Sequence, residues 1–140
     1  MSETRRPEAR PANWLTHLLA QAMAAAANRR REVWSDSFYA DEAKAALAGA
    51  SIPDMRLDDL LALALPGETE MLRYPKWQFE PVVLRQLGQI LLQLEHLSEW
   101  NRHAFFTEEH TLLGMTPLNA LRAGQRDQVL QAAIATNEDY

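Results

Sequence analysis

The sequence predicts a mainly α-helical protein, a compact helical domain that carries one short β-hairpin. Apolar residues recur at spacings of three and four along most of the chain, which is typical of helices with one buried face. Capping residues and prolines precede several of these stretches, and glycines follow them. The chain has 140 residues, enough for a single domain with a real core. Cysteine is absent, which excludes disulfides and thiolate zinc sites and suits a cytoplasmic protein.

The first segment, residues 1–12, is polar and contains two prolines, so we expect a flexible arm there. Asn13 then caps a helix that ends near Arg29–Arg31. Its apolar face consists of Trp14, Leu15, Leu18, Leu19, Ala22, Met23 and Ala26. This stretch is too short and too interrupted to cross a bilayer, so no membrane association is expected.

The middle of the chain predicts a winged helix-turn-helix, within an N-terminal region that spans residues 13–79. A second helix begins near Asp41 and stops at Gly49, a residue suited to the left-handed conformation after a helix. Ser51 and Pro53 open a third helix that runs to Ala64. The segment from Leu63 to Tyr74 then forms a hairpin with its turn at Pro66-Gly67.

The last part, residues 80–140, predicts four helices. Pro81 begins the first, which contains Gly88, a residue that we expect to permit close helix packing. Ser98 caps the next helix, and Thr116 caps a short one that begins at Pro117. Gly124 ends this short helix, and the last helix starts at about Asp127.

Charge is distributed unevenly along the chain, whose net charge is −5. Residues 1–33 carry a net charge of +3, residues 34–70 carry −6, and residues 71–140 carry −2. The third predicted helix would present Asp54, Asp58 and Asp59 to DNA against Arg56 alone, and phosphates would repel them. We therefore expect residues 34–70 not to bind DNA, although the helix-turn-helix pattern keeps a DNA-binding transcriptional regulator as the alternative function.

The sequence predicts no catalytic residues, no metal site and no cofactor. His96, His103 and His110 recur every seven residues near Glu99, but this spacing separates side chains by about 10 Å along a helix. A small metalloenzyme is therefore a third and weaker alternative. No serine lies in a glycine-flanked turn of the hydrolase type, and no glycine-rich phosphate loop is present. We expect the chain not to be an enzyme.

Two segments of the chain carry a recognisable pattern. The first is Arg73-Tyr74-Pro75-Lys76-Trp77-Gln78-Phe79-Glu80. It is similar to the segment that joins a degenerate winged helix-turn-helix to a helical toxin-binding module in one known family, the Xre/MbcA/ParS-like antitoxins. The second segment resembles that module. It consists of Leu112-Leu113-Gly114-Met115-Thr116-Pro117-Leu118, continued by Leu121-Arg122, Gly124, Asp127 and Val129-Leu130. The chain departs from the pattern at Met115, where a second glycine is common, and at Glu109-His110, where Pro-Asn is common.

The resemblance implies an antitoxin-like dimer that neutralises a cognate toxin by covering its active site. The toxin would be of the NAD-consuming RES type or an ADP-ribosylating relative. We expect the partner to contact the constrained loop and helix start, two arginines four residues apart and the aromatic tail, namely Gly114, Met115, Thr116, Pro117, Arg122, Arg126 and Tyr140. A second argument is independent of this resemblance. The apolar faces of the first helix and of the helix after Pro81 are large for a chain of this length, so we expect that a single chain cannot cover both. This also predicts a homodimer.

Overall fold

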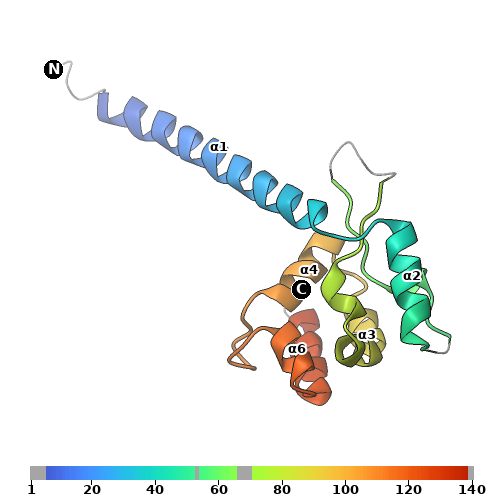
Figure 1. Cartoon of the computed structure of the whole chain (residues 1–140). Helices are drawn as coiled ribbons and strands as arrows, with labels where there is room; N and C mark the ends of the chain where they lie inside the picture. Colours follow the sequence, from blue (N-terminus) through green and yellow to red (C-terminus); the bar gives the residue numbers. More distant parts are fainter. Residues whose placement is uncertain (1–5, 53, 66–70, 139–140) are drawn as a thin grey trace.

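The computed structural model describes the backbone of residues 6–52, 54–65 and 71–138, and within these ranges it is mainly α-helical, as predicted. No segment in those ranges forms more than an isolated β-bridge. Figure 1 shows one long helix that extends away from a body formed by the remaining elements. The helices are α1 (Arg6–Ser35), α2 (Ala40–Ala50), α3 (Pro81–Gln93), α4 (Glu99–Thr107), α5 (Pro117–Arg122) and α6 (Arg126–Glu138), with 3-10 turns η2 (Leu57–Asp59) and η3 (Lys76–Phe79).

Helix α1 is longer than predicted at both ends. It begins at Arg6 rather than at Asn13, so the arm that we expected at residues 1–12 is helical wherever the structure describes it. It also continues past Arg31 to Ser35, because alanine and arginine are both strong helix formers. Every residue from 13 to 25 is exposed, and the last turns of α1 pack against the body through Val33 and Trp34.

The predicted helix-turn-helix is wrong, because its second helix is absent. α2 ends at Ala50, and Ser51, not Gly49, takes the left-handed conformation with φ 55°. Beyond it, Asp54 is also left-handed, with φ 64°. Where a helix to Ala64 was expected, the structure has only the turn η2 and then extended chain.

The extended chain after η2 follows a period of two. The side chains at 61, 63 and 65 are buried leucines, and the alanines at 62 and 64 between them are partly exposed, which is the pattern of a half-buried strand. Leu63 and Arg73 exchange two antiparallel backbone hydrogen bonds of 2.8 and 3.0 Å. The arms of the predicted hairpin therefore meet at this pair, while its Pro66-Gly67 turn lies outside the described residues.

The four predicted C-terminal helices are confirmed, with their caps. Ser98 accepts a hydrogen bond from the Asn101 backbone N–H at 3.2 Å, and Thr116 accepts one from the Asn119 N–H at 3.1 Å. Gly124, with φ 78°, follows α5.

Helix α3 lies at the centre of this part and packs against α5, α6 and η3. Its apolar face is covered, since five of its side chains are buried: Val83, Leu84, Leu87, Ile90 and Leu91. The large side chains on the apolar face of α1 are exposed, so within the described part of the chain the two faces are not both covered, as expected. No helix among the described residues has the length and apolar character to cross a membrane.

Candidate protein-binding site

The loop between α4 and α5 is held in one conformation by its own backbone. His110 and Met115 form an antiparallel bridge in which the His110 N–H donates to the Met115 carbonyl at 3.0 Å. The His110 carbonyl accepts from the N–H groups of Leu113 and Gly114 at 3.0 and 2.9 Å. Gly114 closes this turn with φ 67°, a conformation that side chains disfavour. At the tip, Leu112 keeps 65% of its surface exposed.

His110 connects this loop to α6. Its Nδ1 accepts the Leu112 backbone N–H at 3.2 Å, and its Nε2 lies 3.3 Å from the Thr136 hydroxyl oxygen. Because the Thr136 hydroxyl donates to the Ala132 carbonyl at 2.9 Å, its oxygen is free to accept. The pattern therefore places the imidazole proton on Nε2. His110 therefore connects the loop to α6 through its side chain. Its ring also lies edge-on to the Phe105 ring, with 5.8 Å between the centroids.

The predicted site residues at the start of α5 are mostly turned inward. Pro117 is buried, Thr116 is the N-cap, and Met115 is half-buried and packs against the core. Among the predicted residues 114–117, only Gly114 is exposed. Leu112 is an exposed apolar side chain of this loop that sequence reasoning did not assign to the site, and an apolar residue two positions before the turn glycine was the available signal.

Arg122 is exposed but already paired. Its Nε and Nη2 donate to the two carboxylate oxygens of Glu80 at 2.9 and 2.6 Å, and its Nη1 donates to the Asn119 side-chain oxygen at 3.0 Å. The hydrogen bonds to Arg122 hold the pKa of Glu80 below its ordinary value, and the same bonds raise the pKa of Arg122. This pair fastens the start of α3 to the end of α5.

Arg122 and Arg126 are both exposed, and they lie on different helices, at the end of α5 and at the start of α6. The Arg126 Nε lies 3.8 Å from a carboxylate oxygen of Asp127. Tyr140, the last of the predicted site residues, lies outside the described residues.

A cleft of about 640 Å³ opens beside the Arg122–Glu80 pair. Its walls come from the end of α1, the segment 75–80, α4 and α5, and they include Lys76, Trp77 and His103. Burial lowers the pKa of His103, whose ring lies near the rings of Trp77 and Trp100 at 6.1 and 5.9 Å between centroids.

The three regularly spaced histidines occupy different environments. His96 is exposed, His103 lies among indole rings, and His110 is tied to Thr136. Across the residues that the structure describes, no group of three histidine or carboxylate side chains is arranged to hold a metal ion.

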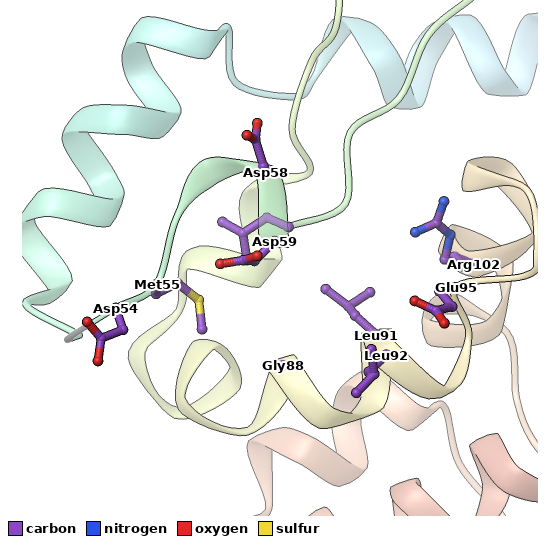
Figure 2. A pocket seen from close by; sticks show the side chains of 10 residues that line it. Asp54, Met55, Asp58, Asp59, Gly88, Leu91, Leu92, Glu95 and Arg102 are labelled. Carbon is purple, nitrogen blue, oxygen red and sulfur yellow. The ribbon is translucent and has the colours of Figure 1, made fainter.

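A second hollow, of about 390 Å³, lies where the third helix had been expected (Figure 2). Apolar side chains, Met55 and Leu91 among them, share its wall with carboxylates and with one cation, Arg102. The carboxylates are Asp54, Asp58, Asp59 and Glu95. Such a negative surface repels nucleic-acid phosphates, which agrees with the charge count of residues 34–70.

The segment 73–80 is a structural junction, and the contacts that its polar side chains make were not predicted from the sequence. Arg73 is 8% exposed, and its guanidinium carbon lies 3.9 Å from the centre of the Tyr39 ring and 4.8 Å from that of Trp34. Its Nη2 donates to the Ser37 carbonyl at 2.5 Å. Arg73 thereby joins the end of α1 to the start of α2.

Gln78, in the same segment, is fully buried. Its Nε2 donates to the Leu61 carbonyl at 2.8 Å, and its Oε1 accepts from the Leu61 N–H at 3.0 Å. The side-chain amide thus replaces a neighbouring strand for Leu61. A polar residue between Trp77 and Phe79 was the only signal of this role in the sequence.

The chain matches none of the known protein-family models, curated proteins or solved structures with which it was compared.

Proposed function

We propose that the chain is a non-catalytic protein-binding module that acts as an antitoxin of the Xre/MbcA/ParS-like kind. It binds a cognate toxin, an NAD-consuming RES-type enzyme or an ADP-ribosylating relative, and covers the active site of that toxin. The proposal draws on the resemblance of residues 71–135 to the toxin-binding module of this family.

The observation that carries the proposal is the loop 108–116. Its backbone is fixed by internal hydrogen bonds and by the tie between His110 and Thr136, yet it presents Leu112 with 65% of its surface exposed. A loop that is already ordered loses little conformational entropy on binding. An exposed apolar side chain on such a loop suits insertion into a pocket of another protein.

The alternative function, DNA binding, depended mainly on the predicted helix-turn-helix, which the structure does not contain among the described residues. The recognition helix that it required is replaced by extended chain, and the surface at that place is lined by four carboxylates. No observation on the described residues favours it over protein binding.

The proposal is tested by co-expressing the full chain with RES-type and ADP-ribosylating toxins from its own genome. We expect one toxin to co-purify with the chain, and cellular NAD and growth to recover in the cells that contain both. The variant Leu112→Glu should weaken this complex about tenfold or more. The matched control is Leu92→Glu on α3, because Leu92 is 63% exposed and lies outside the loop.

Leu112 gives a cleaner test than Arg122, whose replacement would also break the ion pair with Glu80. The proposal fails if no toxin forms a complex, or if Leu112→Glu remains folded and binds the toxin as tightly as the unchanged chain does.

A further inference from the structure

The part of α1 that extends beyond the body carries an apolar stripe whose large side chains no other described element covers. We define the stripe as Trp14, Leu15, Leu18, Leu19, Ala22, Met23 and Ala26. Its five large side chains keep between 40% and 64% of their surface exposed. All the residues recur at spacings of three and four, so they lie along one side of the helix. Figure 1 shows this part of α1 extending into open space.

We propose that the stripe is the interface of a homodimer, in which α1 packs antiparallel against α1 of a second copy. The size of the stripe is the first argument. Its exposed side chains present on the order of 600 Å², close to the roughly 800 Å² per partner of a stable interface. Long helices in proteins also owe most of their stability to packing of an apolar face, which this part of α1 lacks within one chain.

The order of side-chain sizes is the second argument, and it selects a second copy as the occupant. The large residues Trp14, Leu15, Leu18 and Leu19 lie in the first half of the stripe, and alanines dominate the second half. A two-fold axis between Ala20 and Gln21 places Leu15 against Ala26 of the other copy, and Leu19 against its Ala22. Leu15 and Leu19 then meet alanines, and Leu18 meets the flexible Met23, so the two helices can approach closely at both leucine–alanine pairs.

Charge is the third argument, and it selects the antiparallel direction. The stripe contains no Asp, Glu, Lys or Arg, but Arg29, Arg30 and Arg31 follow it directly. Parallel helices would bring the two arginine clusters together, and repulsion would oppose the pairing. The antiparallel arrangement separates them by about 28 Å at a rise of 1.5 Å per residue.

The apolar surface of the stripe extends onto the body of the protein. A groove of about 360 Å³ between α1 and α4 is lined by Ala26, Val33, Trp100 and Ala104, among others. Ala26 and Val33 lie on the side of α1 that carries the stripe. The antiparallel helix of a second copy therefore directs its first turns toward this groove, and the two bodies lie at opposite ends of the helix pair.

Sedimentation equilibrium of the full chain at micromolar concentration provides the first test. We expect twice the 15.9 kDa mass of one chain. Leu19→Asp should weaken dimerisation at least tenfold while the circular dichroism remains helical. The matched control is Leu92→Asp, because Leu92 and Leu19 are 63% and 62% exposed, and it should leave the dimer unchanged. A monomeric chain, or a dimer that Leu19→Asp leaves intact, would overturn the proposal.

Cysteine cross-linking tests the direction of the helices, and the chain offers a clean background because it has no cysteine. Ala22→Cys should form a disulfide-linked dimer with itself. Leu15→Cys should link to Ala26→Cys in a mixture of the two variants, but not to itself. If Leu15→Cys links to itself, the helices are parallel and the proposed interface is wrong. These variants leave the loop at Leu112 untouched, so the outcome is independent of toxin binding.

Discussion

At the scale of single residues, the segment 73–80 shows how a recognisable motif can serve the fold rather than a partner. Arg73 and Gln78 are polar and buried, and each satisfies backbone groups of a segment distant in the sequence, at Ser37 and Leu61. Sequence reasoning located the motif but not these partners, because periodicity and caps report only on neighbours along the chain.

Gln78→Leu should destabilise the protein by about 2–4 kcal/mol, because it leaves both the N–H and the carbonyl of Leu61 buried without a partner. Urea unfolding followed by circular dichroism measures this loss. The control is Gln89→Leu on the exposed side of α3, which should change the free energy of unfolding by less than about 0.5 kcal/mol. Equal effects of the two substitutions would show that Gln78 does not hold the extended segment.

At the scale of elements, prediction from sequence was correct where helix ends carry local chemical signals. Ser98, Thr116 and Gly124 mark their boundaries by capping or by a left-handed conformation, and the structure agrees. Prediction failed for residues 54–64, where the leucines fit a helical period as well as a period of two. The choice there depends on tertiary partners, such as the Trp100 indole N–H that donates to the Ala64 carbonyl at 2.8 Å.

Two glycines should respond in opposite ways to substitution by alanine. Gly114→Ala should cost about 1–2 kcal/mol, because φ is 67° at a position with open space around it. Gly88→Ala should instead stabilise the chain by about 0.5–1 kcal/mol, because the residue is in a helix and an added Cβ meets no atom within 4 Å. The expectation that Gly88 permits close helix packing is therefore wrong.

Thermal melts of both glycine variants provide the comparison. Destabilisation by Gly88→Ala would indicate a packing constraint that the structure does not show.

At the scale of the whole molecule, the sequence predicted the helical class and the four C-terminal helices, but not how the first half is arranged. The long helix α1 has the sequence pattern of an ordinary amphipathic helix, and only the structure shows that the large side chains of its stripe are exposed among the residues described. The loop that is proposed to bind the partner lies between α4 and α5, where the sequence placed a loop before the helix that begins at Pro117. Neither the exposure of Leu112 nor the pairing of Arg122 with Glu80 was predicted, because both depend on packing between elements.

Stability should fall as the pH is lowered from about 7 to about 5. Burial places the pKa of His103 below its ordinary value of 6.5, so the unfolded chain takes up a proton in this range more readily than the folded chain does. The stability that neutral His103 contributes is fully present above pH 6.5. It is lost as the pH falls through the lower pKa that His103 has in the folded chain.

Urea midpoints across this pH range check the effect, and His103→Gln should flatten their dependence on pH. His96→Gln is the matched control at an exposed histidine. A slope that His103→Gln leaves unchanged would contradict the assignment to His103.

The position of the junction segment also determines when the first half of the molecule can fold during synthesis. Ser37 and Leu61 find their partners 36 and 17 residues later, at Arg73 and Gln78. At roughly 5–20 residues per second, the ribosome takes roughly two to seven seconds to add 36 residues. During that time α1 and α2 emerge without the side chains that join them. The first half of the chain can therefore complete its fold only after Arg73 and Gln78, at the start of the second half, have been synthesised.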